Sequence, residues 1–176
     1  MNTLEMTGWK RCPRCGEHEI SHRGDAALEC SACAYLYYHS PAAAVVGIVQ
    51  YQDKIIITRR ANDPGKGLLA IPGGFVEHGE TLEQTLVREL HEELNIHVAD
   101  SVYLASFASE YLFRDVLYKT AVAYFVVRAD ITHARAADDI DHFELVTPDK
   151  VNGSKLAFDI DRQALARYGD WCDRCG

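Results

Sequence analysis

The stretch "GGFVEHGETLEQTLVRELHEELNI", residues 73–96, places three glutamates within one and a half turns of a predicted helix. These glutamates are Glu89, Glu92 and Glu93. Side chains three and four positions apart are neighbours on a helix surface, so Glu89 repels both of the others, by roughly 0.2–0.5 kcal/mol per pair in an isolated helix. Such crowding of negative charge calls for a compensating interaction.

The limits of this helix follow from its capping residues. Thr81 followed by Gln84 fits a capping box, and Asn95 is suited to the left-handed position just past a helix end. At 100° per residue, one arc of the helix surface collects apolar residues and is predicted to face the core. The residues on this arc are Leu82, Leu86, Val87, Leu90 and Leu94.

The three glutamates lie at the border of the apolar arc rather than opposite to it. Glu93 projects inside the edge of the arc, Glu89 lies just beside it, and Glu92 sits further round. A solvated acidic face is the alternative interpretation, which would be favoured if the acids were centred opposite the leucines. A hard divalent cation would relieve both the repulsion and the partial burial, and Mg²⁺, usually shared with phosphate oxygens, is the natural candidate.

The cysteines form a second candidate metal site. All 6 Cys fall in C-x-x-C pairs, a spacing typical of zinc knuckles, and the first two pairs stand 14 residues apart, just below the usual range of about 15–20. Four thiolates make a closed tetrahedral Zn²⁺ site with a structural role. A redox dithiol and a disulfide framework are the alternatives, but the sequence context expected of each is absent. The predicted zinc ligands are Cys12, Cys15, Cys30 and Cys33.

The third pair, Cys172 and Cys175, lies near the C-terminus in "WCDRCG". It offers only two thiols and has no histidine nearby. We therefore interpret it as a free or adventitiously metallated tail.

Composition restricts the class of protein. A length of 176 residues suits a domain of about 130 residues with a small appendage, and 48% hydrophobic residues allow a sizeable core. The formal charge of −8 argues against binding of polyanions by diffuse electrostatics, which needs clustered Lys and Arg. The longest strongly apolar run, residues 42–49, is too short to span a bilayer, so we expect a cytoplasmic protein without a membrane partner.

Turn residues and hydrophobic periodicity divide the chain into a zinc-binding segment, residues 1–40, and a mixed α/β domain, residues 41–176. A hairpin turn is expected at residues 50–53, and a second helix at residues 161–171. The expected strands or extended segments are residues 42–49, 54–60, 68–71, 102–108, 118–127 and 143–146.

The stretch 73–96 resembles the Nudix box, G-x5-E-x7-R-E-U-x-E-E-x-G-U, where U is aliphatic. Asn95 stands where the family has Gly, and Asn tolerates the same backbone conformation. The resemblance implies the MutT-like Nudix fold, an α/β/α sandwich with a mixed sheet, here preceded by a small zinc ribbon. The matching residues are Gly74, Glu80, Arg88, Glu89, Leu90, Glu92, Glu93 and Ile96.

The resemblance extends to "ITRRANDPGKGLLAIPGG", where Leu69 replaces a frequent Trp, and to "KLAFDI" near the end. Together with the cysteine pairs, these segments are similar to zinc-ribbon Nudix hydrolases, which include ADP-ribose and FAD pyrophosphatases. The Gln/Pro/Trp-rich signature usual in the NADH-pyrophosphatase branch is missing, because "SFASEYLFRDV" occupies its place. This departure disfavours NADH and NAD-capped RNA as substrates.

The resemblance also implies roles for individual residues. Glu89 and Glu93 would be the main Mg²⁺ or Mn²⁺ ligands, Glu92 would share a second ion, and the Gly74 carbonyl would be a backbone ligand. Glu80 and Arg88 would orient the acids. The implied reaction is hydrolysis of a nucleoside diphosphate linked to a group X, giving a nucleoside monophosphate and phospho-X.

Residues that contact the substrate are less strongly indicated. Arg60, Phe107 and Tyr111 are candidates, whereas Phe113 and Tyr118 are further aromatic residues that could stack a nucleobase or belong to the core. The general base stays open among loop residues that follow the central strands. These residues are His142, which is in the most natural register, and Asp139, Asp141 and Glu144.

Two other classes of function remain open. A Nudix-fold sensor could bind a nucleotide sugar without hydrolysing it, but the complete set of box acids argues against this. A nucleic-acid-binding ribbon is disfavoured by the acidic chain. The expected partner is a nucleotide-type small molecule, and we allow for a homodimer built through the ribbon. The positive charges near the ribbon are Lys10, Arg11, Arg14 and Arg23.

Overall fold

The computed structural model describes residues 4–5, 10–24 and 27–175. Its two α-helices are α1 (Leu82–Leu94) and α2 (Asp159–Cys175), and two short 3₁₀ helices, η1 (Pro148–Lys150) and η2 (Gly153–Lys155), precede α2. The strands are β1 (Leu4–Glu5), β2 (Ile20–Arg23), β3 (Ala27–Cys30), β4 (Leu36–Tyr38), β5 (Ala42–Tyr51), β6 (Lys54–Arg60), β7 (Leu69–Ala70), β8 (Gly73–Phe75), β9 (His97–Phe113), β10 (Val116–Asp130) and β11 (Ile140–Val146).

The chain divides into two compact units. One comprises Met1–Ala42 and Glu110–Thr120, and the other comprises Ala43–Ser109 and Ala121–Gly176. The sequence predicts two independently folding domains that meet between residues 40 and 41. This boundary stays a prediction.

The larger sheet is mixed. Its strands follow the order β1-β10-β5-β6-β11, while β7 pairs with β6, β8 with β5 and β9 with β10. Strand β1 runs parallel to β10, whereas β5–β6, β5–β8, β6–β7 and β6–β11 are antiparallel pairs. This arrangement confirms the predicted mixed sheet.

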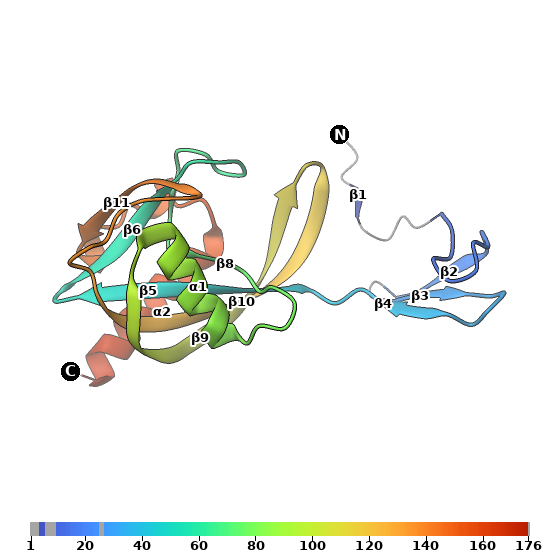
Figure 1. Ribbon diagram of the computed structural model, residues 1–176, viewed down its shortest axis with the longest axis horizontal. Coiled ribbons are helices and arrows are strands. Elements are labelled where there is room, and N and C mark those ends of the chain that lie inside the picture. Colours follow the sequence, from blue (N-terminus) through green and yellow to red (C-terminus); the bar gives the residue numbers. More distant parts are fainter. Residues whose placement is uncertain (1–3, 6–9, 25–26, 176) are drawn as a thin grey trace. The chain divides into compact units, whose positions relative to one another are not determined.

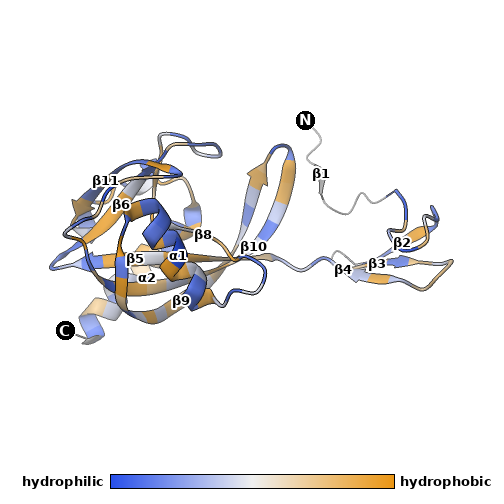
Figure 2. Cartoon of the chain, viewed as in Figure 1, coloured by the Kyte–Doolittle hydropathy of each residue, from blue (hydrophilic) through white to orange (hydrophobic). Residues whose placement is uncertain are grey.

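Successive side chains of a strand point to opposite faces of a sheet. The central strands β5, β6 and β10 therefore place buried apolar side chains on both faces. Helix α1 covers one face and α2 the other (Figure 1), and apolar residues dominate the strands between them (Figure 2). The buried cluster beneath α2 contains Ala44, Ile48, Ile55, Ile57, Ile71, Val122, Tyr124, Val126, Ile160, Ala164 and Tyr168. The cluster beneath α1 contains Val45, Val49, Ile56, Leu86, Leu90, Leu94, Ile96, Ala123, Phe125, Val127 and Ile140. The predicted α/β/α sandwich is confirmed.

The predicted limits of α1 are also confirmed. Thr81 is the N-cap and forms the capping box with Gln84, and Asn95 adopts the left-handed conformation at φ 54°. The prediction of the apolar arc was wrong for one residue, because Val87 is 48% exposed. The helix is rotated toward its glutamate side, so that Thr85 and Glu93 are buried and Val87, on the opposite border, faces solvent.

Other elements are longer than predicted. Strands β9 and β10 extend past their expected ends and turn at Arg114 and Asp115, both of which have positive φ. Helix α2 continues to Cys175, so the cysteine pair expected in a tail lies in its last turn. Cys172 is a free thiol that packs partly against the cluster beneath α2, while the side chain of Cys175 lies outside the described part. None of the described helices has an apolar stretch long enough to cross a membrane.

Candidate metal and active site

Glu93 is a buried carboxylate beside the glycine pair of β8. It is only 7% exposed, and its Oε2 accepts a 2.9 Å hydrogen bond from the Gly73 amide. Desolvation raises the pKa of Glu93 to about 8; the Gly73 amide opposes this shift, while the charges of Glu89 and Asp139 add to it. A carboxylate held in this way is poised to gain from a nearby cation.

Glu89 lies against the next glycine of the same strand. A Cβ placed on Gly74 would lie 2.3 Å from Oε1 and 2.6 Å from Oε2 of Glu89, so only glycine leaves room for this carboxylate. Desolvation raises the pKa of Glu89, against the effect of the Arg88 guanidinium. The two box acids nearest the core therefore both face the backbone of β8.

Gly73 is required for a different reason. Its φ is +147°, and a Cβ there would meet the Val45 carbonyl oxygen at 2.2 Å. The pairing of β8 with β5 brings the two backbones this close, with Gly73 opposite Val46 and Gly74 opposite Val45. The glycine pair thus lets β8 approach the sheet on one side and the carboxylates of α1 on the other.

Arg88 connects the box acids to one another. Its Nε and Nη2 donate to both oxygens of Glu80, at 2.8 and 3.0 Å, and Nη2 also donates to the Phe75 carbonyl. Its Nη1 donates to Glu89 at 2.8 Å and to Glu92 at 3.0 Å. One guanidinium therefore fixes the orientation of Glu80, Glu89 and Glu92, a task that suits its planar fork of donors.

Thr85 supports this arrangement, although its role was not predicted from the sequence. The buried hydroxyl donates a 2.7 Å hydrogen bond to Oε2 of Glu80. Arg88 first, and then Thr85, lower the pKa of Glu80 to about 2. A threonine one turn before Arg88, on the side of the helix that carries Glu92, was the signal available in the sequence.

The four predicted zinc ligands meet beside the small three-stranded sheet β2-β3-β4: Cys30 ends β3, Cys12 and Cys15 lie in the segment before β2, and Cys33 lies in the turn between β3 and β4. Their sulfur atoms all lie within 4.8 Å of one another, and the pairs Cys12–Cys33 and Cys15–Cys30 are each 3.7 Å apart. Tetrahedral Zn²⁺ with bonds of about 2.3 Å requires sulfur separations of about 3.8 Å. The cluster therefore has the donor set and the spacing of a structural zinc site.

Hydrogen bonds prepare one of these thiols for metal. Burial raises the pKa of Cys12, but hydrogen bonds from the Cys15 and Arg14 amides and from the Cys15 and Cys33 thiols together outweigh it and lower the pKa to about 7, while the pKa of the neighbouring Cys15 thiol is raised. Because the thiolate is the ligand, this shift favours metal binding near neutral pH.

Comparison with known proteins identifies the family of the α/β domain. Residues 39–168 match the family model described as the NUDIX domain. The chain belongs to the Nudix family. It is 37% identical over 137 residues to an ADP-ribose pyrophosphatase of Methanocaldococcus jannaschii, with 78% of each chain covered. A Nudix hydrolase from Nitrosomonas europaea shares the fold, at a TM-score of 0.70 and 23% identity, with 91% of this chain and 90% of that chain covered.

A second group of relatives is similar over a shorter span. The chain is 32% identical over 95 residues to the NAD-capped RNA hydrolase NudC of Vibrio parahaemolyticus. This match covers 54% of the Nudix chain described here and 36% of NudC. The chain therefore corresponds to only part of that relative.

Nudix enzymes typically use a divalent metal, and the box residues fit one. Glu89 and Glu93 are oxygen donors with desolvated carboxylates, and Gly74 leaves space for a carboxylate against the β8 backbone. Such hard oxygen donors suit Mg²⁺. Glu92 differs, because its side chain is 47% exposed and is held outward by Arg88.

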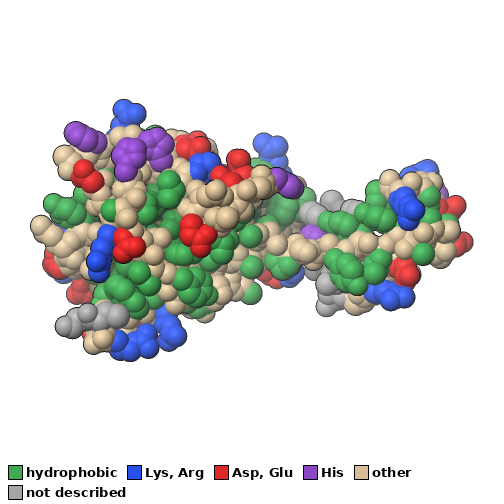
Figure 3. All heavy atoms as spheres, turned by 60° about the horizontal axis from the view of Figure 1, so that its bottom comes forward, with side chains coloured by type: hydrophobic (Ala, Val, Ile, Leu, Met, Phe, Trp, Pro, Cys, Tyr) green, Lys and Arg blue, Asp and Glu red, His purple; other side chains and the backbone are tan. Residues whose placement is uncertain are grey.

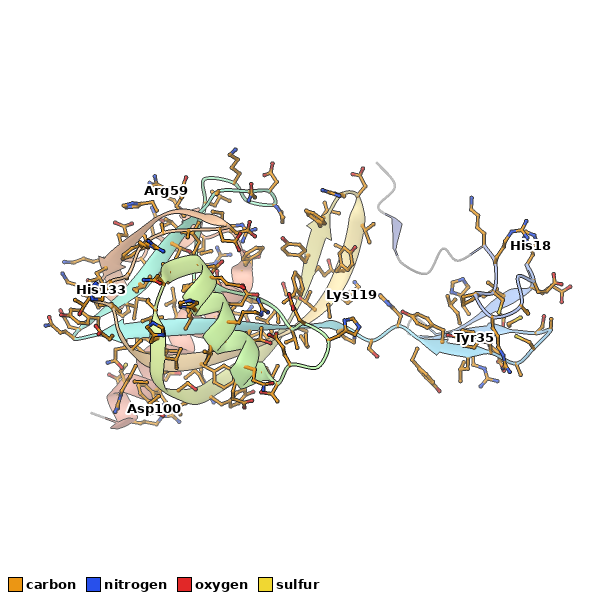
Figure 4. The ribbon with its side chains drawn as sticks, in the orientation of Figure 1. His18, Tyr35, Arg59, Asp100, Lys119 and His133 are labelled. Atoms are coloured by element: carbon orange, nitrogen blue, oxygen red, sulfur yellow. The ribbon has the colours of Figure 1, made fainter. Side chains whose placement is uncertain are left out.

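The loop before β11 contacts the C-terminal end of α1, the helix that carries the box acids. The amides of Arg135 and Ala137 donate to the carbonyls of Leu94 and Glu93, which are otherwise unpaired at the end of α1. Nearby, the Asn95 side chain donates to the His133 carbonyl (Figure 4). The loop is thereby fixed to the end of the helix that carries the box acids.

This loop bears on the candidates for general base. The charge of Asp139 acts on Glu93, and the charge of Asp138 acts on Glu89. His142 lies on β11 opposite the exposed Arg59 (Figure 4). Asp139 is thus the predicted candidate with an electrostatic link to the box, and Asp138, which the sequence did not single out, is a second acid with such a link.

The predicted substrate residues differ in their surroundings. The guanidinium of Arg60 lies 5.2 Å above the Phe158 ring, its Nε donates to the Pro64 carbonyl, and its charge lowers the pKa of Glu93. Phe107 packs edge-on against Tyr124 within the cluster beneath α2, whereas Tyr111 lies 6.3 Å from Phe113 near the tip of the β9–β10 hairpin. Their roles in substrate binding stay predictions.

The visible surface carries no concentrated basic patch. On the face shown in Figure 3, Lys and Arg side chains of the described residues are scattered among acidic and apolar ones.

Proposed function

We propose that this Nudix chain catalyses Mg²⁺-dependent hydrolysis of a nucleoside diphosphate linked to another moiety, X. Water adds across the phosphoric anhydride, so the products are a nucleoside monophosphate and phospho-X. The observation that carries the proposal is the placement of Glu89 and Glu93 against the Gly73–Gly74 backbone, where two desolvated carboxylates face the same strand.

The residues divide the work between binding and orientation. Glu89 and Glu93, with the Gly74 carbonyl and the outer Glu92, would hold the metal. When bound, the metal neutralises phosphate oxygens and lowers the pKa of the attacking water. Arg88 fixes the orientation of Glu89 and Glu92, and Glu80 holds Arg88 in place through both carboxylate oxygens.

ADP-ribose and FAD are the proposed first substrates. The similarity to an ADP-ribose pyrophosphatase covers 78% of both chains, which supports this class. The similarity to the NAD-capped RNA hydrolase covers 36% of that relative, and the downstream NADH signature is absent from the chain. NADH and NAD-capped RNA therefore rank lower.

A product screen tests this proposal. The full chain is incubated with Mg²⁺ and, separately, ADP-ribose, FAD, NADH, dinucleoside polyphosphates, nucleoside triphosphates and NAD-capped RNA, and products are separated by chromatography. We expect AMP with ribose 5-phosphate from ADP-ribose, or AMP with FMN from FAD. A preference for triphosphates with release of pyrophosphate would overturn the substrate class. Tight binding of ADP-ribose without turnover would instead identify a sensor.

The four-cysteine cluster has a separate, structural role in this proposal. It would bind one Zn²⁺ with no ligand position left for substrate, and so stabilise the small β2-β3-β4 sheet. Metal analysis of reduced, purified protein tests it, because a folded ribbon without zinc would contradict the assignment.

A further inference from the structure

Asp161 is a buried acid on the opposite face of the sheet from the box. It lies in the first turn of α2, is 2% exposed, and its Oδ1 accepts a 2.6 Å hydrogen bond from the Tyr124 hydroxyl. Tyr124 is a fully buried residue of β10. Burial raises the pKa of Asp161 to about 6, so keeping an aspartate here has a cost in stability.

The Asp161 carboxylate also faces the backbone that leads into the box. The Ile71 amide lies close enough to lower its pKa, although it does not reach hydrogen-bond geometry. Within the described part of the chain, Oδ2 of Asp161 has no hydrogen-bond partner. This oxygen is therefore available to the Ile71 amide.

Ile71 has no place in the sheet pairing. Strand β7 ends at Ala70, which pairs with Thr58, and β8 begins at Gly73, which pairs with Val46. Ile71 is 4% exposed, and a buried backbone amide needs an acceptor. Asp161 is the side chain that faces this amide.

The carbonyls around Ile71 are already fixed. The Leu69 carbonyl accepts from the Ala157 amide at 2.8 Å, the Ala70 carbonyl from the Thr58 hydroxyl at 2.9 Å, and the Pro72 carbonyl from the Gly47 amide at 2.9 Å. The Ile71 amide, by contrast, has no backbone hydrogen bond among the described residues, and the unpartnered Oδ2 of Asp161 is a nearby acceptor. Two residues later, the Gly73 amide donates to Glu93.

We propose that Asp161 is a positioning residue for the Nudix box: braced by Tyr124, it fixes Ile71 and thereby the Gly73–Gly74 backbone against which Glu93 and Glu89 lie. The proposal rests on the proposed hydrolysis for its kinetic consequence. Asp161 touches no box acid and acts only through the strand. It therefore links α2, on one face of the sheet, to the carboxylates of α1 on the other.

A simpler role for Asp161 is that of a first-turn acid that stabilises α2 through the helix dipole. Asp159 already serves this purpose in the same turn, because its side chain is 84% exposed and pairs with Arg162. An exposed acid stabilises a helix start without a desolvation cost, so the dipole does not account for burying Asp161. The Tyr124 hydroxyl accounts for one oxygen of the buried carboxylate, and the proposal assigns the Ile71 amide to the other.

The test compares three variants of the full chain. Asp161→Asn keeps the side-chain shape but replaces one carboxylate oxygen with an NH₂ group, so the side chain can no longer accept from both the Tyr124 hydroxyl and the Ile71 amide, as the proposal requires. Tyr124→Phe removes the brace and leaves the carboxylate. Asp159→Asn is the matched control, since it removes a first-turn charge that faces solvent.

Two readouts separate positioning from general stability. The first is hydrogen exchange of residues 69–76, measured by mass spectrometry, with residues 54–60 of β6 as internal reference. We expect exchange at residues 69–76 to accelerate at least about tenfold in Asp161→Asn, by less in Tyr124→Phe, and by less than about twofold in Asp159→Asn, with β6 unchanged, because local opening reports local restraint. The second is the Mg²⁺ concentration for half-maximal hydrolysis, expected to rise at least about fivefold in Asp161→Asn and to be unchanged in the control.

Unchanged exchange at residues 69–76, or equal acceleration at β6, would overturn the proposal. So would a lower melting temperature with the wild-type Mg²⁺ requirement. If Asp161→Asn does not fold, Tyr124→Phe decides by the same criteria. If the wild-type chain hydrolyses none of the substrates, the proposed function fails, while the exchange measurement still decides whether Asp161 restrains the strand.

Discussion

The carboxylate of Glu89 occupies the space that a β-carbon on Gly74 would fill, with Oε1 2.3 Å from that position. The requirement for glycine here arises from a side chain of α1 and not from backbone conformation, because Gly74 does not have positive φ. This separates it from Gly73, whose φ is +147° and whose neighbour is the backbone of β5.

The first prediction is that Gly74→Ala impairs hydrolysis more than folding. The methyl group would push the flexible end of Glu89 away from β8, while the β5–β8 pairing accepts alanine. We expect turnover to fall by roughly tenfold to 100-fold and the requirement for Mg²⁺ to rise, measured by steady-state kinetics over a Mg²⁺ titration. Wild-type kinetics in this variant would show that the position of Glu89 is irrelevant to the reaction.

Gly169→Ala is a matched substitution with the opposite expected effect. Gly169 lies within α2, and a Cβ there would meet no atom within 4 Å. Alanine favours the helix over the unfolded chain, so the free energy of unfolding should rise by about 0.5–1 kcal/mol with unchanged kinetics. Denaturant unfolding measures this change, and a loss of stability would contradict the solvent-facing placement of Gly169.

The next prediction concerns Glu93→Gln and its dependence on pH. The pKa of Glu93 is raised from the usual 4.5 to about 8, so ionisation is disfavoured in the folded state. In Mg²⁺-free buffer, this group should make the wild type less stable as pH rises from about 4.5 to about 8, by on the order of 5 kcal/mol in total. Glutamine carries no charge, so the difference in unfolding free energy between variant and wild type should grow in favour of the variant over this range.

Hydrolysis by Glu93→Gln should fall by about 100-fold or more, equivalent to about 3 kcal/mol of lost transition-state stabilisation. Added Mg²⁺ with a non-hydrolysable substrate analogue should stabilise the wild type more than the variant, since the ligand binds the native state alone. Full activity, or equal destabilisation with and without Mg²⁺, would show that Glu93 is only structural.

Arg88→Lys should disrupt the orientation of the box acids without changing their number. A lysine ammonium cannot reproduce the fork that holds both oxygens of Glu80 together with Glu89, Glu92 and the Phe75 carbonyl. We expect kcat/KM to fall by roughly tenfold to 100-fold. Arg59→Lys, on the exposed surface of β6, is the control and should have wild-type kinetics. Equal activity of the two variants would remove Arg88 from the proposed mechanism.

Cys15→Ser should release the zinc. We expect about one Zn²⁺ per chain in the wild type and in Cys172→Ser, and less than half of that in Cys15→Ser, measured by mass spectrometry of metals. The ribbon should unfold in Cys15→Ser, since a site of this size depends on its metal, whereas the Nudix domain has its own core and should keep hydrolysing substrate. Full zinc retention in Cys15→Ser would show that the metal, if present, lies elsewhere.

Much of the helix that carries the box could be predicted because its signals are local. The capping box of Thr81 and Gln84 and the left-handed Asn95 lie within a few residues of the ends that they define, and both were confirmed. Val87 was misplaced, because periodicity gives the apolar arc but not the rotation of the helix about its axis. That rotation is set by β8, where Gly73 and Gly74 make room for acids.

The remaining parts of the site depend on contacts between distant segments. Asp138 and Asp161 each act on a residue of another segment, and no local pattern in the sequence indicates these contacts. The sequence likewise identifies Phe107 only as an aromatic residue on a strand. The fold shows that its ring packs against Tyr124. Residues within the continuous motif, including Glu80 and Arg88, could therefore be predicted from the sequence, whereas contacts from outside the motif could not.

Glu93 joins three segments at one position. Its side chain accepts from Gly73 on β8, its carbonyl accepts from Ala137 in the loop before β11, and its own backbone belongs to the last turn of α1. A displacement of this turn would therefore move the strand and the acidic loop together.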